Sequence, residues 1–296
     1  MFDVILGHIS SGWGSAVCKT IKQNKDDFTS KIVNIDPDFI IVSNPELIKL
    51  VPPKYYSKTV IHLHTGMQFY HQNPKLTNLV LKYSQKINKV IFLTPNFVKE
   101  GQKLGFSNSI FMDNPVRVKS TKENTLNQKK LVFIGRIAPE KRVDKLVQIF
   151  NESKLCDKNW NLNIYGTGDT SNLDIQKNVN IMGGTNNVKE VLENASILAL
   201  TSEYEGFPMV VLEAYACGVP VIAYDYGTSS KELIIDGETG FVIPNDNKKA
   251  YIEKLKYLCE NPEIRQKMGK TAKEKVKKYY PENVAQRWYK LFRGEL

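Results

Sequence analysis

Cysteine is scarce in this chain, and no two cysteines are spaced as a metal or redox motif. The 296 residues contain four cysteines, at positions 18, 156, 217 and 259. They form no CxxC pair, and no histidine cluster lies beside them in the sequence. We therefore expect reduced thiols in a cytoplasmic protein, and neither a disulfide framework nor a metal site.

Long apolar runs are also lacking. A transmembrane helix needs about 20 consecutive apolar residues, and no run in the sequence approaches that length. The first ten residues, MFDVILGHIS, do not combine a charged segment with the apolar core of a signal peptide. These absences favour a cytoplasmic location.

The charge of the chain is positive and unevenly placed. The formal net charge is +10, and residues 1–128 hold 16 Lys and Arg against 9 Asp and Glu. A basic first half favours an anionic partner, such as the inner face of the cell membrane or a lipid-linked diphosphate. A solvated lysine-rich surface would give the same count, so both explanations stay open. No helix-turn-helix, RNA-binding aromatic pair or zinc spacing accompanies the charge, and we expect no nucleic-acid partner.

Short apolar runs alternate with helical patterns along the whole chain, which predicts α/β domains with parallel sheets. The predicted strands are residues 2–6, 39–42, 60–63, 89–93, 130–135, 162–165, 179–182, 197–200 and 219–224. The predicted helices are residues 16–23, 76–86, 96–104, 143–150, 188–194, 248–259, 262–279 and 282–291. The length suits two domains. We predict a first domain over 1–117, a polar linker over 118–128 and a second domain over 129–281, with the helix within 282–296 docking back on the first.

Residues 197–244 carry the strongest functional signal. A buried strand over 197–200 runs into the loop of Glu205 and Gly206, and Pro208 suits the start of a helix that Cys217-Gly218 should end. Unpaired amides and the dipole at a helix N-terminus attract an anion such as phosphate. Asp236-Gly237, further on, predicts a hairpin-type turn.

Two glutamates flank this predicted phosphate site. Glu205 lies in the loop before the helix, and Glu213 lies within the helix. Two carboxylates beside a phosphate are unfavourable unless each accepts hydrogen bonds from hydroxyl groups, so a sugar nucleotide fits the pair better than free phosphate. The alternative is an ordinary solvated loop acid and an ordinary acid on a helix surface.

Further loops at the ends of predicted strands could also bind phosphate. Arg136 and Lys141 follow the strand over 130–135, where they could clamp a diphosphate or be ordinary surface cations. Gly166-Thr167-Gly168 follows the next strand, and Gly12-Trp13-Gly14 follows the first. Either glycine turn could cradle a phosphate or simply be tight.

Histidines and aspartates of the first half offer weaker signals. His62 and His64 lie on one side of an extended chain, with His71 as the nearest further metal ligand. We expect His64 to donate a hydrogen bond to a ligand, or to cap the strand, without a metal. Asp36-Pro37-Asp38 matches the two-carboxylate motif of metal-binding loops in some sugar-transfer enzymes, but we expect an ordinary turn there.

Five segments in one order resemble the family 4 retaining glycosyltransferases of GT-B fold. They are Gly135-Arg136 with Lys141, Tyr165 to Gly168, Glu205 to Pro208 with Glu213, Gly218 to Ile222, and Asp236-Gly237 with Gly240-Phe241. The resemblance is strong over 129–296 and weaker over 1–128, where Gly12-Trp13-Gly14 and His64-Thr65 carry it. It implies two Rossmann-like, doubly wound α/β domains facing across a cleft, the second of which holds a nucleotide-sugar donor.

The resemblance also implies roles for individual residues. Arg136 and Lys141 would bind the donor diphosphate, Glu205 the sugar hydroxyls, and His64 the sugar from across the cleft, and these four form the implied catalytic set. The implied donor-binding residues are Gly12, Gly14, Gly166, Met182 beside the base, the backbone of Phe207, Pro208 and Met209, the amides of Val210, Val211 and Leu212, and Glu213 at the ribose.

The function implied is transfer of a hexosyl unit, with retention, from a nucleotide sugar to a surface-glycan precursor or a related acceptor, lipid-linked or polysaccharide. We expect a UDP-linked donor, no metal, and contact with the inner face of the membrane through the basic first domain. Two alternatives stay open: a nucleotide-sugar epimerase of GT-B fold, and a non-catalytic donor-binding subunit of a heteromeric transferase.

Overall fold

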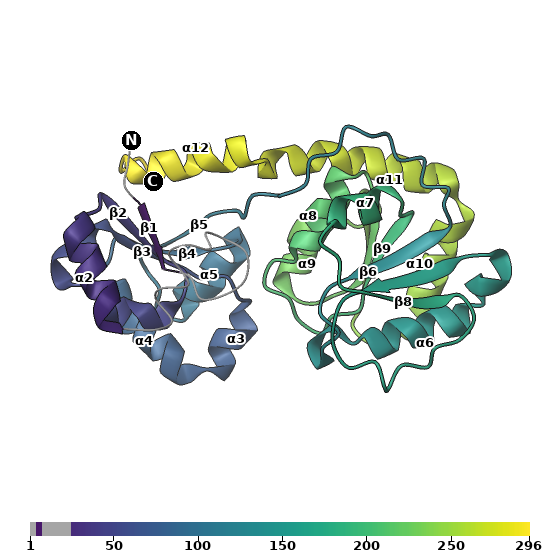
Figure 1. The fold of residues 1–296 in the computed structure, drawn as a ribbon, viewed down its shortest axis with the longest axis horizontal. Helices are drawn as coiled ribbons and strands as arrows, with labels where there is room; N and C mark the ends of the chain where they lie inside the picture. The colour runs from purple at the N-terminus through teal and green to yellow at the C-terminus, as the bar shows by residue number, and fades with distance from the viewer. Residues whose placement is uncertain (1–3, 8–24) are drawn as a thin grey trace. The chain divides into compact units, whose positions relative to one another are not determined.

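The computed structural model describes residues 4–7 and 25–296, with side chains from residue 29 onward except that of residue 31. Its contacts divide the chain into two compact units (Figure 1). Unit 1 comprises Met1–Asp113 and Arg287–Leu296, and unit 2 comprises Asn114–Gln286. Each unit is built on a parallel sheet. Gly12, Gly14 and the predicted helix over 16–23 lie outside the described residues.

The sheet of unit 1 follows chain order, β1-β2-β3-β4-β5, and every neighbouring pair of strands is parallel. Its strands are β1 (Val4–Gly7), β2 (Phe39–Val42), β3 (Thr59–His62), β4 (Lys89–Phe92) and β5 (Ser109–Phe111). The segments between them carry α2 (Lys25–Ile35), η1 (Pro45–Leu50), η2 (Pro53–Lys58), α3 (Met67–Gln72), α4 (Pro74–Ser84) and α5 (Pro95–Lys103). Crossovers between parallel strands are right-handed, so a sheet wound in one direction receives all of its connecting helices on one face.

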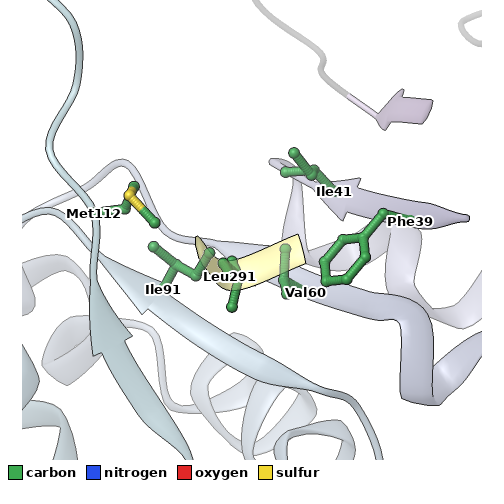
Figure 2. Packing of buried hydrophobic residues seen from close by; sticks show 6 residues of the cluster. All are labelled: Phe39, Ile41, Val60, Ile91, Met112 and Leu291. Carbon is green, nitrogen blue, oxygen red and sulfur yellow. The ribbon is translucent and has the colours of Figure 1, made fainter. Parts of the chain in front are cut away.

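The opposite face of this sheet is covered by the C-terminal helix α12 (Pro281–Phe292). Leu291 is buried in an apolar cluster with residues of β2, β3 and β4 and with Met112, as Figure 2 shows. The cluster consists of Phe39, Ile41, Val60, Ile91, Met112 and Leu291, with Ile110, Trp288 and Phe292 packed against it. Arg287 lies over the Phe111 ring at 3.8 Å and donates to the Phe111 carbonyl at 2.8 Å. Tyr289, by contrast, is 59% exposed.

Unit 2 contains the sheet β11-β10-β9-β6-β7-β8, again parallel between neighbours. Its strands are β6 (Lys130–Ile134), β7 (Asn161–Tyr165), β8 (Val179–Gly183), β9 (Ile197–Leu200), β10 (Val221–Tyr224) and β11 (Gly240–Ile243). The helices are η3 (Pro139–Lys141), α6 (Val143–Ser153), η4 (Leu155–Lys158), α7 (Val188–Glu193), α8 (Met209–Ala216), α9 (Thr228–Leu233), α10 (Lys248–Glu260), α11 (Pro262–Lys275) and η5 (Val276–Tyr279). The strand order reverses between β6 and β9, and such a switch point is where open α/β sheets bind ligands.

Helix α8 ends where the sequence predicts. Cys217 is its C-cap and Gly218 follows with φ of +69°, a conformation that favours glycine. Gly269 of α11 lies so close that an added Cβ atom would be 2.1 Å from the Gly218 carbonyl oxygen. The two glycines therefore let α11 pack directly on the end of α8.

Most predicted elements are confirmed with bounds shifted by one to three residues, and the exceptions have physical causes. β5, β11, α2, α3 and α9 were not predicted, because each is short or lacks a clear apolar period. The turn predicted at Asp236-Gly237 is present, with φ of +76° at Gly237, but it closes no hairpin, because β11 pairs in parallel with β10. Residues 118–128, predicted as a linker, lie in unit 2, where the Asn124 side chain donates to the Leu192 and Ala195 carbonyls.

No helix in the described part of the chain combines the length and the apolar character that a membrane span requires.

Leu291→Ala should destabilise unit 1. It removes a buried side chain from the face that α12 covers, and such truncations cost about 2–5 kcal/mol. Lys290→Ala, one residue earlier on the exposed side of α12, is the matched control and should change stability by less than about 0.5 kcal/mol. Urea unfolding of the full chain measures both variants, and equal effects would contradict the packing.

Candidate functional site

The carboxyl ends of β6, β9 and β10 bring several predicted site residues together in unit 2. Lys141 follows β6, and Glu205 lies in the loop after β9. The Lys141 amine lies 2.6 Å from Glu205 Oε1, and the Ser202 hydroxyl donates to the same oxygen at 2.7 Å. The two charged side chains are only 18% and 12% exposed. A charge pair at a switch point, with little water around it, can bind a ligand that is anionic and rich in hydroxyl groups.

Arg142 joins the loop after β6 to the loop after β9. The sequence analysis did not identify this residue. Its backbone is left-handed, with φ of 47°, and its guanidinium is buried. Nε donates to the Thr201 carbonyl at 3.0 Å, and the Thr201 hydroxyl donates back to the Arg142 carbonyl at 2.8 Å. A further nitrogen pairs with Asp246 at 3.2 Å. These bonds fix Lys141 and Ser202, the residues beside them in the sequence, so that both reach Glu205.

Arg136 takes a different position. Its side chain is 74% exposed and pairs with Glu140 at 2.7 Å. In the described part of the chain, Arg136 pairs with Glu140 whereas Lys141 pairs with Glu205. Its exposure matches the surface-cation alternative that the sequence left open, although a long exposed arginine can still reach a ligand at the loop.

The glycines at 166 and 168 are explained by the packing of two loops. An added Cβ atom on Gly166 would lie 1.8 Å from the Gly135 carbonyl oxygen, and one on Gly168 would lie 1.9 Å from the Ile137 carbonyl oxygen. The Ile137 amide donates to the Thr167 carbonyl at 2.8 Å. The close approach therefore requires glycine at both positions even without a ligand.

Helix α8 begins at Met209, with Pro208 as its N-cap, one residue after Pro208 and two after Phe207, the two predicted starts. The Val211 amide donates to the Pro208 carbonyl at 3.0 Å and is therefore engaged within the helix. The side chains of Phe207, Val211 and Leu212 are buried, and those of Met209 and Val210 are half-buried. The side chains of this turn thus serve packing, and a ligand would meet its backbone.

Glu213 is half-buried on α8. Burial raises the pKa of its carboxyl above the ordinary value, and the charge of Arg117 acts in the opposite direction. A carboxylate held at a desolvation cost, with a cation nearby, differs from the ordinary surface acid that was the alternative prediction.

Met182 lies at the end of the edge strand β8, and 48% of it is exposed. Its neighbour Ile181 is also exposed. Consecutive side chains of a strand point to opposite faces, so Met182 by itself offers an exposed apolar side chain on which a planar ring can lie.

His64 belongs to unit 1, beside the end of β3. Its ring centroid lies 4.0 Å from that of His62, which in turn lies 5.5 Å from Trp288 of α12. Asp36 has a left-handed backbone, with φ of 46°, and accepts a hydrogen bond from the buried Tyr55 hydroxyl at 2.8 Å. Among the described residues, no three His, Cys, Asp or Glu side chains are grouped so as to hold a metal ion.

Tyr226 adds a buried polar group that the sequence did not single out. It follows β10 by two residues, and its hydroxyl is buried without a hydrogen-bond partner in the described part of the chain. Burial raises the pKa of this phenol well above its ordinary value, and the nearby charge of Glu205 adds to the effect. A buried hydroxyl without a partner is unfavourable by about 1–3 kcal/mol.

Comparison with known proteins adds a family match and relatives. Residues 117–275 match the family model described as "Glycosyl transferases group 1". The chain is 25% identical over 292 residues to the poly(ribitol-phosphate) alpha-N-acetylglucosaminyltransferase of Staphylococcus aureus (strain COL), covering 90% of this chain and 57% of the relative. The chain thus spans about half the length of the curated relatives that it matches first.

Two solved structures show the same fold. A crystal structure of S. aureus TarM with fondaparinux, alpha-GlcNAc-glycerol and UDP matches with a TM-score of 0.77 at 22% identity, over 89% of this chain and 58% of that one. Anabaena HepE with UDP and glucose matches with a TM-score of 0.81 at 14% identity, over 99% and 100% of the two chains. With the two parallel sheets, these likenesses confirm the predicted GT-B fold class.

Tyr226→Phe should stabilise the free protein by roughly 1 kcal/mol, because it removes the buried hydroxyl that has no partner. The matched control is Tyr215→Phe. The Tyr215 hydroxyl is hydrogen-bonded to Thr239 Oγ1 at 2.7 Å, so its removal should destabilise the protein by about 1 kcal/mol. Thermal unfolding distinguishes the opposite signs, and a loss of stability in both variants would mean that the Tyr226 hydroxyl is paired.

Glu213→Gln should stabilise the free protein at neutral pH. The raised pKa means that the folded chain binds this proton more tightly than the unfolded chain, so stability falls as pH rises through the window between the two pKa values. The gain from Gln should be present above that window and vanish below pH of about 4, where the acid is protonated in both states. Melting temperatures across this pH range measure it, and a gain independent of pH would contradict the electrostatic cause.

Proposed function

Because the chain belongs to the glycosyl transferases group 1 family, we propose that it is a glycosyltransferase that moves a hexosyl unit from a nucleotide sugar to a surface-glycan precursor or a related acceptor. The observation that carries the proposal is the buried cluster of Lys141, Glu205 and Ser202 at the switch point of the unit 2 sheet. It supplies a cation for phosphate and a carboxylate for sugar hydroxyls at one place.

A UDP-linked donor is part of the proposal. The TarM and HepE structures are complexes of those proteins with UDP. In this chain, the base would lie on the exposed side chain of Met182 and the ribose would bind Glu213. The diphosphate would bind Lys141 and Arg136 beside the first turn of α8, with Gly166 nearby. The contacts with the donor predicted for Gly12, Gly14 and His64 remain part of the proposal.

The proposed reaction is a displacement at the anomeric carbon of the sugar. The bond from this carbon to the diphosphate oxygen breaks while a bond to the acceptor oxygen forms, and the departing phosphate oxygen takes the proton of the acceptor hydroxyl. Negative charge grows on the diphosphate, so the preset cations stabilise the transition state more than the ground state. We propose that they do this without a metal, and that attack from the same face retains the anomeric configuration.

The proposed acceptor is an anionic or lipid-linked glycan precursor. The name of the S. aureus relative assigns it a poly(ribitol-phosphate) acceptor. In this chain, the excess of Lys and Arg over residues 1–128 would favour such an acceptor and would also favour contact with the inner face of the membrane.

A thermal-shift screen with UDP-, GDP- and ADP-sugars tests donor binding. A ligand that binds the folded state alone at 100 times its dissociation constant adds about 2.7 kcal/mol. We expect a shift with UDP-sugars, lost in Arg136→Ala and in Glu213→Ala. Lys248→Ala, an exposed cation paired with Glu152 at 2.6 Å, is the control and should keep the shift.

Transfer of radiolabelled sugar to lipid-linked and polyol-phosphate acceptors, with and without EDTA, tests the reaction, and product NMR tests retention. Donor binding without turnover would instead support the donor-binding subunit, and isomerised nucleotide sugar would support the epimerase. Absence of binding by any nucleotide sugar would refute the proposal.

A further inference from the structure

The ion pair between Lys141 and Glu205 neutralises the very cation that a phosphate would need. In the free protein, Glu205 Oε1 accepts hydrogen bonds from the Lys141 amine, at 2.6 Å, and from the Ser202 hydroxyl, at 2.7 Å. Both charged side chains are largely shielded from water. The pair therefore cannot be treated as an exposed salt bridge of negligible energy.

An anion that reaches Lys141 must compete with this carboxylate. It either separates a shielded pair or brings its own charge next to Glu205, and both are unfavourable. When Lys141 leaves Glu205, the carboxylate loses a hydrogen-bond donor. A ligand that donates hydrogen bonds to Glu205 replaces that donor, and hydrogen bonds to a charged acceptor are stronger than those between neutral groups. Sugar hydroxyls beside a phosphate can do this, whereas a fully ionised diphosphate without a sugar has no such donor.

We propose that Glu205 is a specificity-determining residue that acts as a removable counterion to Lys141, lowering the affinity for a bare diphosphate and favouring a diphosphate that carries a sugar. The proposal rests on the proposed function for the identity of the ligand. It adds that the same carboxylate weakens the hold on the nucleoside diphosphate once the sugar has left, which favours release of that product.

The second cation of the site supplies an internal comparison. Arg136 pairs with Glu140 at 2.7 Å, but 74% of the arginine is exposed. Water can replace Glu140 there, so this pair contributes little and should not discriminate between ligands. Two carboxylates, each paired with a cation of the site, thus differ chiefly in how far their cations are shielded.

Glu205→Gln tests the proposal, because glutamine keeps the shape and can still accept hydrogen bonds from Lys141 and Ser202 while removing the charge. Calorimetry with inorganic pyrophosphate should show about tenfold tighter binding than in the wild type. Glu140→Gln is the matched control and should change pyrophosphate affinity by less than about threefold. Circular dichroism and thermal unfolding confirm that each variant is folded.

The same variants are then measured with UDP and with UDP-glucose or UDP-N-acetylglucosamine. In Glu205→Gln, the preference for the sugar-bearing ligand over UDP should fall by about tenfold, and in Glu140→Gln it should stay unchanged. The proposal is overturned if Glu205→Gln does not bind pyrophosphate, or binds it no more tightly than the wild type does.

The two proposals fail in different ways. If no nucleotide sugar binds or reacts but Glu205→Gln tightens pyrophosphate binding, the counterion stands and the transferase is refuted. Suppose instead that sugar transfer occurs, but wild type and Glu205→Gln show the same preference for UDP-sugar over UDP. The transferase function then stands, and the counterion role of Glu205 is refuted.

Discussion

The candidate site depends on a group of buried charges where the loop after β6 meets the loop after β9. Arg142 joins the two loops through paired hydrogen bonds with Thr201, and Lys141 and Ser202 converge on one oxygen of Glu205. Charges taken out of water must be compensated by partners, so each of these groups restricts where the others can lie. The result is a preset site whose carboxylate and amine can each change partners when a ligand arrives.

A second constraint acts on unit 1. A parallel sheet whose strands follow chain order leaves one face without crossover helices, and that face is apolar. Leu291, Trp288 and Phe292 of α12 supply the missing cover. Because α12 begins in unit 2 and ends in unit 1, the stability of the unit 1 sheet depends on residues more than 170 positions away in sequence, as the Arg287–Asp113 pair illustrates.

The sequence predicted much of the fold because its signals are local. Apolar runs such as 197–200 became buried strands, and Cys217-Gly218 ended its helix, since burial and left-handed backbone depend on residue type within a few positions. The sequence also predicted that Lys141 and Glu205 serve one site, because parallel strands place their carboxyl ends along one edge. The turn at Asp236-Gly237 formed without a hairpin, because a turn motif does not specify the partner of the strand that follows it.

The amino-acid sequence by itself determined the α/β class, the family and the loops that carry the candidate site, because these follow from periodicity, from glycine and proline positions and from motif order. Only the tertiary structure decided which charges are paired and which are exposed. Lys141 and Arg136 are both cations on one loop, yet one is shielded beside Glu205 and the other lies in water. Likewise Arg142 and Tyr226 acquire their importance from burial. For Arg142, burial brings contacts with distant segments, such as the bond to Asn245, 103 residues away.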